Sequence, residues 1–114
     1  MKLSRYLVIA SLATLAFPLA ANAAAGSVKI LAPVDNAMLD ADEEYPLNYE
    51  ITLGAGDDHF HVWVDDKKSP AQRTVKGTYT LPKLSPGKHA IYIKIVDKGH
   101  TPTGPEQTIH VTTK

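Results

Sequence analysis

The chain has 114 residues, no cysteine, and twelve basic against twelve acidic side chains. The lack of cysteine excludes disulfides, thiolate catalysis and cysteine-ligated metals, so the fold must stand on packing alone. The balanced charge provides no basic stripe for a nucleic acid and no excess of either sign to attract a membrane surface. A chain of this length builds one small hydrophobic core.

The first 23 residues are predicted to be a signal peptide. Lys2 and Arg5 form a basic start, residues 7–19 are almost wholly apolar, and residues 21–23 (Ala-Asn-Ala) have the small-x-small pattern of a cleavage site. The apolar run is too short for a stable membrane span. The sequence therefore predicts export to a bacterial periplasm or beyond, a mature domain over residues 24–114, and no membrane insertion after cleavage.

Short alternating segments separated by proline, glycine and acidic turns fill the rest of the chain. We expect strands over residues 27–31, 46–53, 59–64, 73–81, 89–97 and 107–112. Met38 and Leu39 are expected to fold back onto the core, and residues 67–71 to form a loop. No segment has a period of 3.6 residues. Six or seven short strands at this spacing are typical of an immunoglobulin-like antiparallel β-sandwich.

The segment over residues 59–64 alternates strictly. Successive side chains of a strand point to opposite faces. Phe60, Val62 and Val64 therefore share a core face, whereas His59, His61 and Trp63 occupy the other face. This second face carries two imidazoles and the only tryptophan of the chain.

Three elements together resemble exported bacterial immunoglobulin-like domains of unknown function. These domains carry a His-rich strand that ends in an acidic residue, then a Leu-x-Pro-Gly-Lys-His strand, then an Asp-x-x-His-x-Pro loop. Residues 59–65, 84–95 and 97–102 correspond to these elements. The resemblance covers roughly residues 28–112. It implies an exported protein with an immunoglobulin-like fold, but it transfers no activity to this chain. The Pro-Gly-x-His turn before His89 also occurs in unrelated sandwiches, where it is structural.

The histidines predict a divalent metal site formed by His59, His61 and His100. Same-face residues two apart on a strand lie about 7 Å apart, so two rings can lean onto one ion. Imidazole suits copper and zinc, and a loop must supply the third ligand. Asp57 or Asp58 could add an oxygen, and Asp97 could orient a ring. The alternative is that His59 and His61 are ordinary solvated or packed residues, with Lys94 beside His61.

A second hypothesis places a binding face on Trp63, Tyr92 and His110. Exposed aromatic rings with polar neighbours can stack on a glycan or anchor a protein partner, here a periplasmic one. The alternative is a buried sandwich tryptophan whose parity is reversed by a bulge. Both hypotheses, the metal site and the aromatic binding face, make the chain a binding or accessory module.

Catalysis is not expected. Ser27, Ser69 and Ser85 lie at an edge and in loops without an elbow motif, and the adjacent carboxylate pairs diverge on strands or turns. Calcium binding at residues 33–35 and 40–44 stays open, although the twelve-residue calcium loop with its central glycine is absent.

Overall fold

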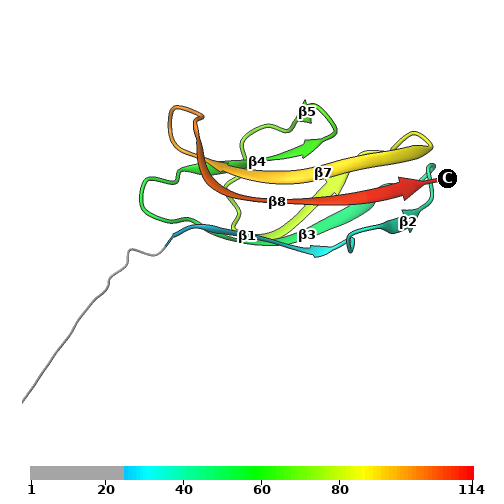
Figure 1. The fold of residues 1–114 in the computed structure, drawn as a ribbon, viewed down its shortest axis with the longest axis horizontal. Helices are drawn as coiled ribbons and strands as arrows, with labels where there is room; N and C mark the ends of the chain where they lie inside the picture. Colours follow the sequence, from blue (N-terminus) through cyan, green and yellow to red (C-terminus); the bar gives the residue numbers. More distant parts are fainter. Residues whose placement is uncertain (1–24) are drawn as a thin grey trace, which may run out of the picture.

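Two β-sheets pack face to face in the computed structural model, which describes residues 25–114 (Figure 1). The first sheet has the order β1-β3-β6, with β1 at Ser27–Ala32, β3 at Tyr45–Thr52 and β6 at Lys76–Leu81. The second has the order β2-β8-β7-β4-β5, formed by β2 (Ala37–Leu39), β4 (His59–Val64), β5 (Lys67–Lys68), β7 (Gly87–Val96) and β8 (Pro102–Thr113). The predicted immunoglobulin-like β-sandwich is confirmed.

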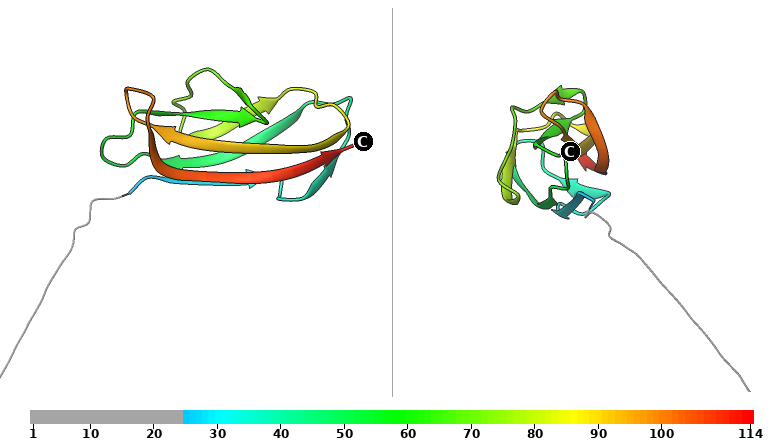
Figure 2. Two further views of the ribbon diagram at one scale, coloured as in Figure 1. Left: turned by 45° about the horizontal axis from the view of Figure 1, so that its top comes forward. Right: turned by 90° about the vertical axis from the view of Figure 1, so that its left-hand side faces the viewer.

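The long strands run along the sandwich and are antiparallel to their neighbours (Figure 2). Strand β7 lies between β4, which carries His59 and His61, and β8. One pairing departs from the antiparallel prediction, because β2 runs parallel to β8. The chain reaches β2 by crossing from one sheet to the other after β1. Within residues 25–114 no helix has the length and apolar character needed to cross a membrane.

The core lies between the sheets and consists of the inward side chains of alternating strands. On β4, Phe60 and Val62 are 0% and 1% exposed, as the alternation predicts, and Val64 packs against the core. The other main contributors come from β3, β7 and β8: Leu47, Tyr49, Ile51, Ile91, Ile93, Ile95, Ile109 and Val111. Tyr49 meets Phe60 edge-on with ring centroids 5.2 Å apart, which joins the two sheets at the centre.

The structure corrects several local expectations. Met38 is 58% exposed because β2 is an edge strand, whereas Leu39 packs on the core. Strand β6 begins at Lys76, later than predicted, and β8 begins at Pro102, earlier than predicted. With the two short strands β2 and β5, residues 25–114 contain eight strands, against the expected six or seven. The predicted signal peptide and cleavage site lie outside the described residues.

Candidate metal centre

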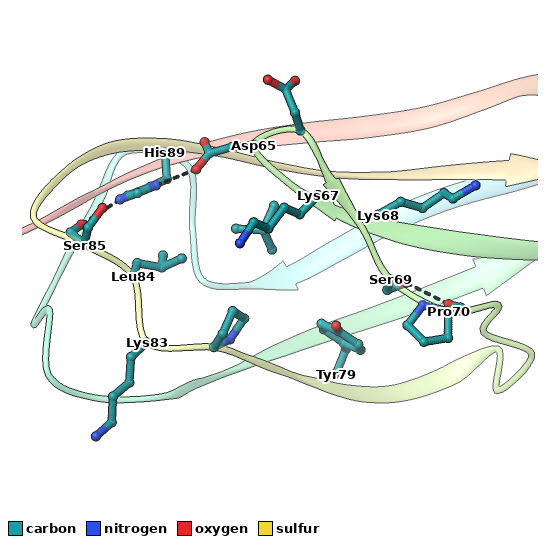
Figure 3. A pocket seen from close by; sticks show the side chains of 13 residues that line it. Asp65, Lys67, Lys68, Ser69, Pro70, Tyr79, Lys83, Leu84, Ser85 and His89 are labelled. Carbon is teal, nitrogen blue, oxygen red and sulfur yellow. Dashed lines mark hydrogen bonds and ion pairs between the residues drawn. The ribbon is translucent and has the colours of Figure 1, made fainter.

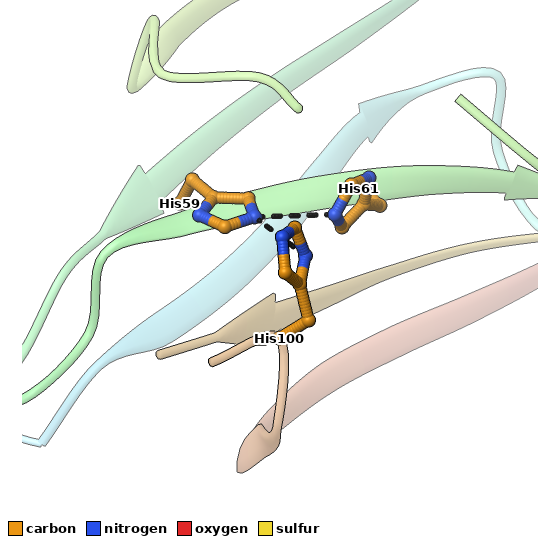
Figure 4. Close-up of side chains that lie close together, drawn as sticks. All are labelled: His59, His61 and His100. Atoms are coloured by element: carbon orange, nitrogen blue, oxygen red, sulfur yellow. Dashed lines mark hydrogen bonds between the residues drawn. The ribbon is translucent and has the colours of Figure 1, made fainter. Parts of the chain in front are cut away.

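Three imidazole rings converge at one end of the five-stranded sheet (Figure 4). Nε2 of His59 lies 3.2 Å from Nε2 of His61 and 3.3 Å from Nδ1 of His100. The candidate ligand atoms of the three residues all lie within 4.8 Å of one another. The predicted set of His59, His61 and His100 is therefore brought together by the fold.

Two of the three rings are buried although they face away from the core. His59 is 2% exposed and His61 is 4% exposed. The segment after β5 covers them, because Ser69 donates its backbone N–H to the Val62 carbonyl and Gln72 exchanges two backbone hydrogen bonds with Phe60. The polar composition of residues 67–71 predicts a loop, and nothing in it indicates that this segment covers the histidine face.

Each buried ring donates its remaining N–H to a fixed acceptor. Nδ1 of His59 lies 2.8 Å from a carboxylate oxygen of Asp58, and Nδ1 of His61 lies 2.8 Å from the carbonyl oxygen of Ser69. The hydrogen bond with His59 holds the pKa of Asp58 below its ordinary value against the opposing effect of burial, and the charge of Arg73 assists. Asp58 is therefore an ionised acceptor. In the neutral form of each ring, these partners place the proton on Nδ1.

Burial also favours the neutral form of His61. It lowers the pKa of this ring, while the hydrogen bond to the Ser69 carbonyl acts in the opposite direction. The neighbouring His59, Lys68 and His100 add small repulsive contributions to the charged form. A neutral imidazole is the form that binds a metal, so the environment of His61 prepares it as a ligand.

His100 approaches from the loop between β7 and β8 and is exposed. Its φ angle of 65° lies in the left-handed region, which is uncommon for a residue with a side chain. The carboxylate of Asp97 accepts hydrogen bonds from the backbone N–H groups of Gly99 and Thr101, at 2.8 and 3.0 Å. Asp97 therefore orients the turn that carries His100, whereas the predicted role of orienting a ring belongs to Asp58.

The cation expected beside His61 is directed away from the cluster. Lys94 lies opposite His61 in the β4–β7 pairing, but its Nζ is 3.9 Å from Glu106 and 5.4 Å from the centroid of the Tyr92 ring. Asp57 accepts a hydrogen bond from the N–H of Gly54 and closes a turn. Both side chains are therefore engaged by partners outside the three-histidine cluster.

The aromatic residues of the second hypothesis lie on the same sheet face. Trp63 and Tyr92 stack with ring centroids 5.7 Å apart and an interplanar angle of 7°, and Lys68 lies over Trp63. Trp63 pairs with Lys68 on one side and Tyr92 on the other, so both neighbours cover its ring faces. His110 lies opposite Ala90 and pairs with Asp35 at 3.4 Å, apart from the stack. A glycan or protein surface there stays a prediction.

Sequence reasoning missed two contributors to the cluster, Ser69 and Arg73. Ser69 was considered only as a nucleophile, whereas its carbonyl holds His61 and its hydroxyl accepts from the N–H of Val62 at 2.9 Å. Arg73 lies 3.2 Å from Asp58 and was not considered at all. The position of Asp58 directly before His59 was the one available signal. Asp35, one of the residues considered for calcium, accepts a hydrogen bond from the backbone N–H of His110 at 2.7 Å.

Comparison with known proteins shows the fold and nothing finer. No protein-family model matches the chain, and no curated protein matches it. A solved structure described as "Structures of Clostridium thermocellum CbhA fibronectin(III)-like modules" is similar, with a TM-score of 0.60 and 18% sequence identity. The match covers 76% of this chain and 95% of that one. The chain therefore has the two-sheet sandwich fold of fibronectin(III)-like modules.

Proposed function

We propose that this chain is an exported binding or accessory module that holds one divalent transition-metal ion through His59, His61 and His100. The proposal rests on the convergence of the three rings and on the hydrogen bonds that fix two of them. The fibronectin(III)-like fold supports a module that binds rather than transforms a ligand, although fold alone never assigns function. The export signal predicted from residues 1–23 supports a periplasmic or secreted location.

The 3.2 Å separation of the two Nε2 atoms carries the proposal. When both rings are neutral and each Nδ1 donates to its own acceptor, both Nε2 atoms present lone pairs. Two lone pairs at this distance repel each other, and a cation bound by both nitrogens removes that repulsion. A metal ion is such a cation, and the carboxylate and carbonyl acceptors are the outer partners that metal-bound histidines usually have.

The donor set favours zinc or copper(II) as the ion. Imidazole nitrogen suits both metals, and no cysteine is available to select a softer ion. Bonds of about 2.0–2.1 Å at tetrahedral angles separate two nitrogens by about 3.3 Å. The His59–His61 and His59–His100 separations of 3.2 and 3.3 Å match this spacing. Three protein ligands leave a further position for water or for a group on another molecule.

Calorimetric titration of the purified protein with Zn(II) and with Cu(II) tests the proposal. We expect one ion per chain, and loss of this uptake in the double variant His59→Ala/His61→Ala. His110→Gln is the matched control, because it removes an exposed histidine of the same sheet without touching the cluster. Unchanged uptake in the double variant, or no uptake by the unaltered protein, overturns the proposal.

A further inference from the structure

A second histidine site lies at the opposite end of β4 and is independent of the proposed metal centre. His89, near the start of β7, stands between Asp65 and Ser85 (Figure 3). Its Nδ1 is 2.7 Å from a carboxylate oxygen of Asp65, and its Nε2 is 2.6 Å from the carbonyl oxygen of Ser85. The side chain is only 10% exposed.

Both ring nitrogens of His89 therefore face acceptors that cannot donate to them. A neutral imidazole has one N–H and one lone pair, so it satisfies only one of the two oxygens. The imidazolium form has two N–H groups and satisfies both. The hydrogen bond with Asp65, followed by that with the Ser85 carbonyl, raises the pKa of His89 against the effect of burial.

The two acceptors belong to different segments. Asp65 follows β4 and opens the turn into β5, and its second oxygen accepts the backbone N–H of Ala90 at 3.0 Å. Ser85 lies in the loop between β6 and β7, and its carbonyl also accepts from the hydroxyl of Thr113. His89 thus ties the β4–β5 turn to the β6–β7 loop.

The same two segments form the walls of a groove of about 680 Å³ at the open side of the sandwich. Residues 64–70 line one wall, and residues 82–85 line the other, with Tyr79 and His89 completing it. The position of the β6–β7 loop relative to the turn therefore sets the width of the groove at the end where His89 lies.

The charged groups around His89 come from every neighbouring segment. Asp65, Asp66 and Lys67 lie in the β4–β5 turn, Lys83 lies in the β6–β7 loop, Lys88 precedes the ring on β7, and His110 with its partner Asp35 lies on the β8 side. Only Asp65 makes an ion pair with the ring. Lys83 points away from it (Figure 3). The Asp65 carboxylate is therefore the charge that matches an imidazolium here.

We propose that His89 is a protonation-controlled clasp: as an imidazolium it holds the β6–β7 loop against the β4–β5 turn and so fixes the width of this groove, and it releases the loop when it becomes neutral. The neutral ring keeps its N–H on the Asp65 carboxylate, because that acceptor is charged. Its Nε2 lone pair then faces the Ser85 carbonyl oxygen. That oxygen loses one of its two hydrogen-bond donors, His89, and keeps the other, the hydroxyl of Thr113. Thr113 keeps the base of the loop attached.

A titration of the isotope-labelled protein by nuclear magnetic resonance from about pH 5 to pH 8 tests the clasp. We expect the ring nitrogens of His89 to keep the imidazolium pattern to a pH above the ordinary histidine pKa of 6.5. The backbone amides of Ser85, Gly87 and Lys67 should shift with the midpoint of His89. His89→Gln should abolish this shift, and His110→Gln should leave it unchanged.

Asp65→Asn keeps the test decisive if His89→Gln folds poorly. It removes the charge while keeping an acceptor, so the midpoint of His89 should fall and the loop amides should follow it. Loop amides that do not respond when His89 titrates overturn the clasp. So does a loop response that persists with the same midpoint in His89→Gln.

Discussion

The carboxylate of Asp58 lies 2.8 Å from Nδ1 of His59, in the residue directly before it in the chain. This contact directs Nε2 of His59 towards His61 and His100, and Arg73 holds the far side of the same carboxylate at 3.2 Å. An ionised acceptor on a ligand histidine increases the basicity of the nitrogen that binds the metal. The pair therefore connects a solvent-facing salt bridge to the buried cluster.

Asp58→Asn should weaken metal binding by about tenfold to a hundredfold, the usual effect of losing an outer partner. The amide retains the shape and one acceptor but removes the negative charge that favours a ligating His59. Competition with a chelator of known affinity measures the change. Asp66→Asn, an exposed carboxylate in the β4–β5 turn, should bind like the unaltered protein. Equal metal affinities for the two variants would show that the Asp58 carboxylate does not support the metal site.

His100→Asn should separate the metal site from the stability of the fold. His100 is exposed and has a φ angle of 65°, a conformation that asparagine adopts readily. The free energy of unfolding of the metal-free variant should lie within about 1 kcal/mol of that of the unaltered protein, because the substitution removes no buried contact. Its metal affinity should nevertheless fall, since only two ligands remain. Thermal unfolding with and without Zn(II) measures both effects; undiminished stabilisation by zinc would contradict a three-histidine site.

Metal binding should raise the stability of the sandwich as a whole. An ion that binds only the folded chain adds about 2.7 kcal/mol at a free concentration of 100 times Kd. For a domain of this size the midpoint temperature then rises on the order of 10 °C. Differential scanning calorimetry should show this rise in the unaltered protein, reversed by a chelator. Magnesium, which prefers oxygen ligands, should produce no such rise.

The ion pair of His89 and Asp65 should contribute to stability within a limited pH window. The pKa of His89 is raised from its ordinary value of 6.5, so its contribution is complete below that value and disappears as the pH rises through the raised pKa. Burial opposes ionisation of Asp65, but the hydrogen bonds from His89 and Ala90 outweigh it. They lower its pKa from 3.8, so that contribution is lost as acid protonates the carboxylate.

Denaturant unfolding of the unaltered protein and of His89→Gln measures this window. The difference in free energy of unfolding should be largest between the two ordinary values of 3.8 and 6.5 and should shrink on either side. His110→Gln removes the exposed pair with Asp35 and serves as the comparison. A difference for His89→Gln that stays the same from below 3.8 to well above 6.5 would show that the pair contributes through packing alone.

The sequence predicts the fold and the identity of the site because both depend on local alternation. The period of two over residues 59–64 assigns Phe60 and Val62 to the core and the two histidines to the other face. Antiparallel pairing with the isoleucine-rich strand then brings the β7–β8 loop, and with it His100, to the same end of β4. No long-range information beyond strand order is needed for that step.

The environment of the site depends on contacts that no local pattern encodes. Residues 67–72 are polar and contain a proline, so they resemble a free loop, yet they lie along β4 and bury His59 and His61. The backbone carbonyl of Ser69 is a ligand-orienting group that any residue type could supply. The His89 clasp likewise depends on how the β6–β7 loop closes, which the Pro-Gly turn alone does not specify.

X-ray absorption at the metal edge of the zinc-loaded protein tests the central claim most directly. We expect three imidazole nitrogens in the first shell at about 2.0–2.1 Å and one further light ligand. In His59→Ala/His61→Ala this imidazole signature should disappear, while His110→Gln should retain it. A first shell of oxygen atoms, or an imidazole count that the double variant leaves unchanged, would contradict a metal site built on His59, His61 and His100.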